Sequence, residues 1–150
     1  MTKTLEIRPI EATDHAEWKR LWTDYLTFYE SSVSEEIYAT SFARLLSDEA
    51  GTYNGHIALL DGAPVGLVHY LFHAHMWHKE QVCYLQDLFA DPSARGAGVG
   101  RALIQSVYDA ADARSVHNVY WTTQEFNTTA RRLYDRIGTL TPFIKYQRPG

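Results

Sequence analysis

The stretch of this sequence with the clearest chemical meaning is a glycine-rich segment, Arg95-Gly96-Ala97-Gly98-Val99-Gly100-Arg101. Glycine has no Cβ atom, so a ligand can approach the backbone of this segment closely. A helix is predicted to begin at Gly98, and the N–H groups of its first turn have no partner within the helix. These donors, the helix dipole and the two flanking arginines favour a bound anion, and a diphosphate suits them best.

The spacing of the glycines distinguishes this segment from two common phosphate-binding loops. A P-loop requires Gly-x-x-x-x-Gly-Lys followed by Ser or Thr, and the segment contains no lysine. The dinucleotide fingerprint Gly-x-Gly-x-x-Gly is also absent, because the third glycine comes one residue early. The remaining pattern is Arg-x-x-Gly-x-Gly, formed by Arg95, Gly98 and Gly100, and it follows a predicted strand that ends at Asp91-Pro92.

The elements that must position this segment alternate between helices and strands. Apolar residues at helical spacing predict helices over 18–29, from Ser34 to before Gly51, over 98–114 and over 128–137. Alternating or continuous apolar runs predict strands at 5–8, 56–60, 64–72, 82–90, 119–123 and 143–146. The order β-α-α-β-β-β-α-β-α-β predicts one α/β (α+β) domain over residues 1–150 with a mixed sheet.

The composition excludes several classes of protein. With 45% hydrophobic and 13% aromatic residues and a net charge of −4, the chain has ample material for a folded core. No apolar run approaches the roughly 18 residues that span a bilayer, and the first residues lack a signal-peptide core. The single cysteine, Cys83, cannot form an internal disulfide. We therefore expect a cytoplasmic protein with no membrane partner, and its mild acidity argues against a nucleic-acid partner.

The glycine-rich segment resembles the acetyl-coenzyme A signature of the GCN5-related N-acetyltransferase (GNAT) family. A second segment, Asn127-Thr128-Thr129-Ala130-Arg131-Arg132-Leu133-Tyr134, is similar to the Asn-x-x-Ala-x-x-Leu-Tyr pattern in the second half of that family. The predicted order of elements also matches the family fold. The resemblance implies a GNAT fold with about six to seven strands and about four helices. It also implies acetyl-CoA as cosubstrate and an amine as acceptor.

The resemblance further implies which residues hold the coenzyme. Backbone groups at the end of the strand before the glycines would pair with the pantetheine arm, and the amides of the glycine-rich segment would hold the pyrophosphate. Asn127 would bond to the coenzyme arm, and Tyr134 would protonate the departing thiolate; the alternative for Tyr134 is a core side chain with its hydroxyl at the edge. The implied cofactor-binding residues are Leu88, Phe89, Ala90, Arg95, Gly96, Ala97, Gly98, Val99, Gly100, Arg101, Asn127 and Tyr134.

Acetyl transfer also requires a route for the proton of the amine. A primary ammonium with a pKa of about 10.4 is neutral in about one molecule in 2,500 at pH 7, a cost of about 4.6 kcal/mol. Tyr84-Leu85-Gln86-Asp87 resembles the Tyr-Leu-Glu-Asp segment of polyamine and histone-type acetyltransferases, but Gln86 replaces the Glu proposed as base. An amide orients a water or an amine without accepting the proton. Three routes stay open, in the order in which the sequence favours them. The first is a water wire positioned by Gln86, the second is Glu125 as the base, and the third is Asp87, which ideal alternation places opposite Gln86.

Charge and histidine content suggest further features of the acceptor site. Acidic side chains are concentrated in residues 1–50, where the family has the two helices that wall the acceptor site. Either they attract a cationic amine, or they form a solvated helix surface. His69, His73, His75 and His78 lie around a predicted hairpin; we expect no metal, while a role of His73 or His75 in the amine site or as a proton shuttle stays open.

We expect the acceptor to be the primary amine of a small molecule, either polyamine-like or an amino acid. The alternatives are a protein lysine or N-terminal acetyltransferase, or a CoA-binding regulatory module without turnover. The predicted strand at 143–146 would complete its own sheet or that of a neighbour, and the resemblance is compatible with a homodimer.

Overall fold

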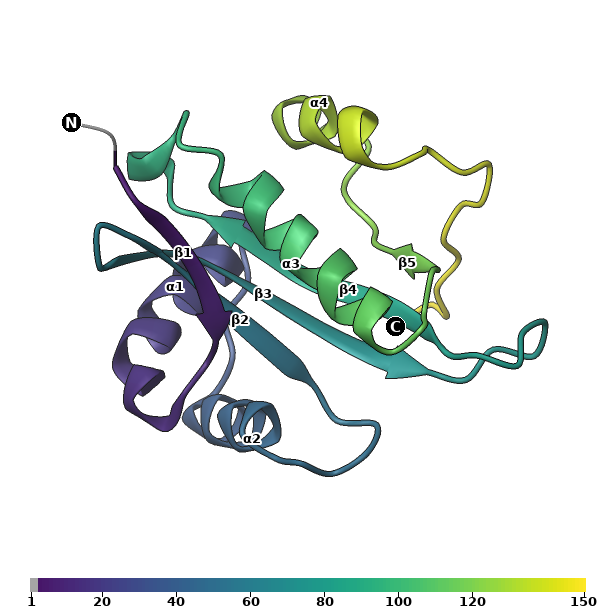
Figure 1. Ribbon diagram of the computed structural model, residues 1–150, viewed down its shortest axis with the longest axis horizontal. Helices are drawn as coiled ribbons and strands as arrows, with labels where there is room; N and C mark the ends of the chain where they lie inside the picture. Colours follow the sequence, from purple (N-terminus) through teal and green to yellow (C-terminus); the bar gives the residue numbers. More distant parts are fainter. Residues whose placement is uncertain (1–2) are drawn as a thin grey trace.

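In the computed structural model, which describes residues 3–150, helices cover both faces of one twisted sheet (Figure 1). The strands are β1 (Leu5–Pro9), β2 (Asn54–Leu60), β3 (Ala63–His73), β4 (Val82–Ala90) and β5 (Val119–Tyr120). The helices are α1 (His15–Phe28), α2 (Glu35–Leu45), α3 (Val99–Ala113) and α4 (Thr128–Ile137), with short 3₁₀ turns η1 (Ala12–Asp14) and η2 (Pro92–Ala94). The predicted α/β class is confirmed, and none of these described helices is long and apolar enough to cross a membrane.

The five strands lie in the sheet in the order β1-β2-β3-β4-β5. The first four are antiparallel, whereas β5 runs parallel to β4. β5 pairs with β4 at two positions, Cys83 with Val119 and Tyr84 with Tyr120, while β4 continues along β3 as far as Ala90. Among residues 3–150, the edge of β4 beyond Tyr84 therefore has no strand beside it, and β4 and β5 separate there.

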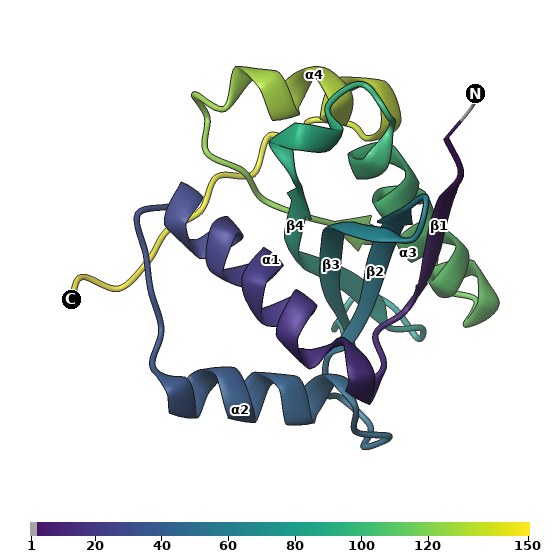
Figure 2. The same cartoon turned by 90° about the vertical axis from the view of Figure 1, so that its left-hand side faces the viewer.

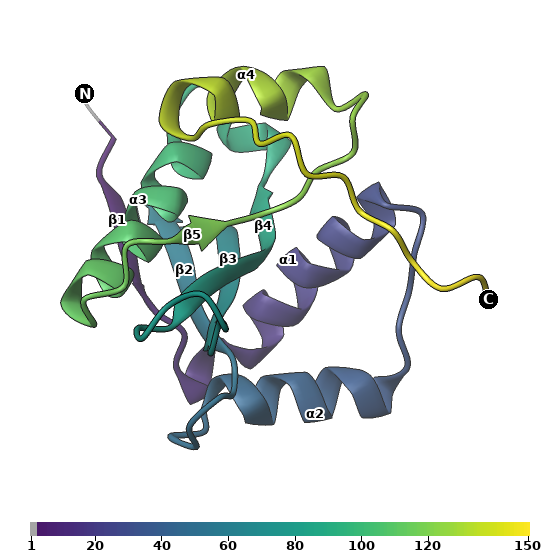
Figure 3. The same cartoon turned by 90° about the vertical axis from the view of Figure 1, so that its right-hand side faces the viewer.

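The two faces of the sheet carry separate apolar clusters. α1 and α2 cover one face, where Trp18, Trp22 and Phe42 pack against Ile57 and Leu67 of the sheet (Figure 2). α3 covers the other face through a buried stripe at helical spacing, which consists of Val99, Leu103, Val107 and Ala111. In Figures 2 and 3, η2, the start of α3 and α4 gather at the same end of the molecule. This end is also where β4 and β5 separate.

A β-bulge in β4 changes the direction of two side chains that matter for the site. His69 of β3 pairs with Asp87, and the next residue, Tyr70, pairs with Leu85, so Gln86 is the extra residue on β4. Asp87 accepts a hydrogen bond from Trp22 of α1, and Gln86 accepts one from Tyr53, whose pKa is raised by burial and then by the charge of Asp87. Gln86 and Asp87 thus face the same side of the sheet. The prediction of opposite sides is wrong because a bulge interrupts the two-residue alternation.

The C-terminal part of the predicted sheet does not form. The predicted strand over 119–123 is confined to Val119–Tyr120, and residues 143–146 form no strand. Within the part of the chain that the structure describes, the sheet therefore has five strands rather than six to seven. Because β5 is only two residues long, it provides too short a ladder for another strand. Phe143, Ile144 and Tyr146 are 79%, 78% and 88% exposed on a tail that extends from α4 (Figure 3).

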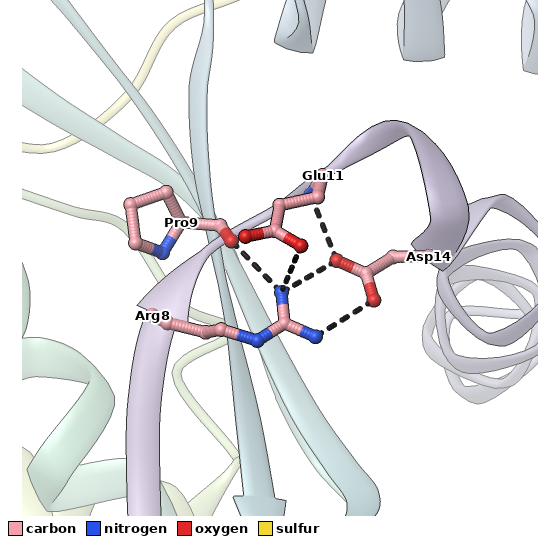
Figure 4. Close-up of polar contacts among 4 residues, drawn as sticks. All are labelled: Arg8, Pro9, Glu11 and Asp14. Carbon is pink, nitrogen blue, oxygen red and sulfur yellow. Dashed lines mark hydrogen bonds and ion pairs between the residues drawn. The ribbon is translucent and has the colours of Figure 1, made fainter.

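An ion pair that the sequence pattern did not indicate joins β1 to the start of α1. The Arg8 guanidinium donates two hydrogen bonds to the Asp14 carboxylate, at 2.7 and 2.9 Å, and the backbone N–H of Glu11 donates a third at 2.7 Å (Figure 4). The hydrogen bonds from Arg8 lower the pKa of Asp14. The pair stabilises the turn that places α1 across the sheet.

Candidate acetyl-transfer site

A narrow pocket lies where β4 and β5 separate. It brings together Gln86 and Tyr134, two of the residues that the sequence predicts for the site, with residues of α1 and of the segment after β5. The lining residues are Tyr25, Tyr29, Leu85, Gln86, Leu88, Trp121, Thr122 and Tyr134. Glu125 is exposed on the loop before α4 and does not line the pocket.

The glycine-rich segment forms an open turn leading into α3. Gly96 and Gly98 have φ values of +87° and +76°, a left-handed conformation that favours glycine. Apart from the chain neighbours, a Cβ atom on either would meet no atom of the described residues within 4 Å. Both positions therefore leave space directly above the backbone. Ala102 donates the first helical hydrogen bond, to the Gly98 carbonyl oxygen at 3.0 Å.

Five N–H groups of this segment have no acceptor among the described residues, those of Gly96, Gly98, Val99, Gly100 and Arg101. The N–H groups of Arg95 and Ala97 are already bonded, each at 3.2 Å, to the carbonyl oxygens of Pro92 and Ala94. The predicted set of seven amide donors is therefore reduced to five. These five surround the positive end of the α3 dipole, which suits a diphosphate.

The third glycine of the segment contributes to helix packing. A Cβ atom on Gly100 would lie 3.2 Å from Cδ2 of Leu133, because α4 crosses close to the first turn of α3. Gly100 and the Leu133-Tyr134 end of the second motif thus meet in space. Their contact sets the distance between the glycine-rich turn and the pocket.

Two residues of the second motif have well-defined local environments. Asn127 caps α4: its Oδ1 accepts from the Ala130 N–H at 3.5 Å, and its Nδ2 donates to Thr123 Oγ1 at 3.4 Å. The Tyr134 ring packs edge-on against Trp121, and burial followed by the neighbouring Tyr29 raises the pKa of Tyr134 to about 12. The Tyr134 hydroxyl is therefore protonated at neutral pH, as a proton donor must be.

The residues around the bulge form a second group of polar contacts next to the pocket. Tyr53 donates a 2.6 Å hydrogen bond to Oε1 of Gln86 and fixes the orientation of that amide. The buried Asp87 carboxylate accepts hydrogen bonds from His69 and Trp22. The sequence pattern places Trp22 only within the predicted helix over 18–29, and no signal in the sequence indicated that its indole N–H would bond to Asp87.

The four histidines around the predicted hairpin lie in different environments. His69 is buried against Asp87, whereas Nε2 of His73 lies 2.7 Å from the Tyr120 hydroxyl. His75 accepts from the Trp77 backbone N–H at 3.1 Å, and His78 lies 3.7 Å from Glu80. No group of three or more potential metal ligands occurs within residues 3–150.

Comparison with known proteins agrees with this geometry. Residues 18–139 match the model of the acetyltransferase (GNAT) family. Over 146 residues the chain is 36% identical to the D-amino-acid N-acetyltransferase HPA3 of Saccharomyces cerevisiae. The matched region covers 96% of this chain and 90% of HPA3. The chain therefore belongs to the GNAT family and is an N-acetyltransferase, and acetyl-CoA is the donor that this family uses.

Solved structures share the fold at lower sequence identity. AAC(6')-Iy, in complex with a bisubstrate analogue that contains CoA, superimposes with a TM-score of 0.82 at 18% identity over 98% of this chain and 99% of that chain. A ribosomal-protein-alanine N-acetyltransferase from Brucella melitensis biovar Abortus 2308 gives a TM-score of 0.80 at 18% identity, with the same coverage. These likenesses confirm the predicted fold.

Proposed function

We propose that this protein transfers the acetyl group of acetyl-CoA to the primary amine of a small molecule, an amino acid or a polyamine-like compound. One observation carries the proposal: Gly100 of the open glycine-rich turn lies against Leu133, the chain neighbour of Tyr134, which lines the pocket where β4 and β5 separate. The relative's printed activity toward D-amino acids supports an amino-acid acceptor.

The residues at this opening fit the donor. The free edge of β4 offers backbone groups of Leu88, Phe89 and Ala90 to the pantetheine arm in the way that an added strand would use them. The five free N–H groups between Gly96 and Arg101 suit the pyrophosphate, and the side chains of Arg95 and Arg101 add positive charge. Asn127 completes the proposed set through its amide at the start of α4.

The pocket residues supply the proton transfers. Acetyl-CoA provides the thioester carbonyl at which the amine nitrogen forms a new N–C bond while the C–S bond breaks. Tyr134 donates its hydroxyl proton to the departing sulfur, which its place in the pocket beside Gln86 supports. Gln86, held by Tyr53, orients the water that carries away the proton of the amine.

The two carboxylates that compete with the water wire are in different positions. Asp87 lies next to Gln86 on the same side of the sheet, whereas Glu125 is exposed outside the pocket lining. This arrangement favours Asp87 over Glu125 as the second candidate to receive the proton, which reverses the order that the sequence suggested.

Thiol release from acetyl-CoA tests the proposal. The panel comprises D- and L-amino acids, a polyamine and a lysine-containing peptide, and calorimetry measures CoA binding to the same preparation. We expect CoA binding together with turnover on an amino acid or on the polyamine. Binding of CoA without turnover on any acceptor, or turnover on the peptide alone, would contradict a small-molecule transferase.

We also propose that two copies of the chain associate through the C-terminal tail. The large apolar side chains of Phe143, Ile144 and Tyr146 are exposed, and contact with a second copy of the chain would remove them from water. Light scattering should show a dimer that becomes monomeric when Phe143 and Ile144 are both replaced by Ser. A monomeric parent protein at micromolar concentration would contradict the proposal.

A further inference from the structure

A chain of buried polar side chains connects α1 to the bulge of β4. The Trp18 indole N–H donates to Nε2 of His69 at 2.9 Å, and Nδ1 of His69 lies 2.8 Å from Oδ2 of Asp87. The indole N–H of Trp22 donates to the same Asp87 oxygen at 3.3 Å. Trp18 is completely buried, and His69 and Asp87 are 5% and 8% exposed. We call Trp18, Trp22, His69 and Asp87 the relay.

The hydrogen bonds of the relay determine which nitrogen of His69 carries the proton. An indole N–H can only donate, so Nε2 of His69 must act as an acceptor toward Trp18. The proton of the neutral imidazole is therefore on Nδ1, from which it is donated to Asp87. The two indole rings stack at 5.3 Å, which fixes both indole donors in place.

The relay gives Asp87 a fixed orientation. Both donors bind Oδ2, so the carboxylate cannot rotate without breaking two buried hydrogen bonds, and Oδ1 is engaged by neither donor. Asp87 is also cross-strand partner of His69 at the bulge, which couples the two residues through the backbone.

The charge of Asp87 acts on the pocket through its tyrosines. Burial, and after it the charge of Asp87, raises the pKa values of Tyr25 and Tyr29, both of which line the pocket. Gln86, the residue adjacent to Asp87, lines the same pocket. A positive charge in the pocket would therefore be attracted by the oriented carboxylate of Asp87. The rings of Tyr25 and Tyr29, which line the pocket, also attract cations.

We propose that His69 is a positioning residue for the acceptor: by orienting Asp87, the chain neighbour of the pocket residue Gln86, it sets the affinity of the enzyme for the ammonium form of the amine. This inference rests on the proposed function, because it concerns the same pocket. It adds a residue, His69, that does not itself face the pocket, and it assigns Asp87 to recognition of the cation. A relay with a purely structural role would connect β3, β4 and α1, and its loss would not change KM for the amine selectively.

The test compares two replacements of His69 in steady-state kinetics. His69→Leu removes both polar contacts, whereas His69→Asn keeps an amide N–H near the position of Nδ1 for donation to Asp87. We expect His69→Leu to raise KM for the amine at least about 10-fold, with kcat and the Kd for CoA changed less than about twofold. His69→Asn should recover most of the lost affinity. Leu67→Val controls for loss of packing, because Leu67 lies in the same strand as His69 and in the apolar cluster that contains Trp18 and Trp22.

Two results of this comparison would overturn the inference. A folded His69→Leu variant with an unchanged amine KM overturns the inference, as does a parallel loss of kcat and CoA affinity that matches Leu67→Val. If the parent protein binds CoA but acetylates no amine in the panel, the proposed function fails instead.

Nuclear magnetic resonance of the parent protein tests the relay without any variant and without turnover. The ¹⁵N shifts of His69 at neutral pH should show Nδ1 protonated and Nε2 unprotonated. A proton on Nε2 would contradict the relay even if the His69→Leu variant does not fold.

Discussion

Replacement of Gly98 by alanine separates the cost of backbone strain from the cost of a blocked ligand site. Gly98 has a φ of +76°, so an alanine there should cost about 1–2 kcal/mol of stability. For a chain of this size, that cost corresponds to a fall in Tm of about 2–8 °C. Apart from its chain neighbours, no residue among 3–150 comes within 4 Å of the added Cβ, so any further effect must come from a ligand over this position.

The expected loss of affinity follows from the donors at this turn. If the methyl group displaces the pyrophosphate from a single N–H, the lost hydrogen bond to a charged group costs about 1.5–3 kcal/mol. Calorimetry should therefore show CoA binding weakened about 10- to 100-fold. Gly98→Glu, which adds negative charge as well as bulk, should abolish binding.

Gly51→Ala is the matched control. Gly51 has a φ of +84° and equally open surroundings, but it lies in the connection between α2 and β2, away from the glycine-rich turn (Figure 2). Its replacement should lower Tm by a similar amount and leave the Kd for CoA unchanged. Equal CoA affinities for the two variants would refute the placement of the pyrophosphate over Gly98.

Four other replacements test the pocket and the fold. Tyr134→Phe should lower kcat about 100-fold or more while the Kd for CoA stays constant, and a parental kcat would exclude Tyr134 as the acid. Glu125→Gln should leave the pH–rate profile unchanged because Glu125 is exposed outside the pocket, and a shifted profile would restore Glu125 as the base. Asp87→Asn should raise KM for the amine. Asp14→Asn should cost about 1–3 kcal/mol in urea unfolding at pH 7. Because Arg8 lowers the pKa of Asp14 below its ordinary 3.8, this stabilisation is present above that value and is lost as the pH falls through the folded pKa. Identical urea midpoints for parent and variant at pH 7 would contradict that assignment.

Much of the fold could be predicted because local signals agreed with the final packing. The bounds of β4 and α4 were predicted as they occur, and Ser34 caps α2 by accepting a hydrogen bond from the Ile37 N–H. The glycine-rich turn was predictable for a related reason: Gly96 and Gly98 adopt backbone angles that few other residues tolerate. At these positions the local conformation depends on the type of the residue itself, so the sequence is sufficient to predict it.

Features that depend on pairing between distant segments could not be predicted. The bulge at Gln86 arises from the register of β4 against β3, and it reverses the predicted direction of Asp87. The apolar pattern of residues 143–146 predicts a strand, but a strand also requires a partner edge, which the two-residue β5 is too short to supply. The contacts of Trp18 and Trp22 were missed because helical spacing shows which residues are buried, not what an indole N–H will meet.

A crystal structure of the protein with CoA would test the central claim most directly. We predict that the pyrophosphate oxygens lie within hydrogen-bonding distance of the N–H groups of Gly98, Val99 and Gly100, with the thiol end of the coenzyme directed between Gln86 and Tyr134. A coenzyme bound elsewhere, or a pyrophosphate held by side chains with these N–H groups directed at solvent, would contradict the account.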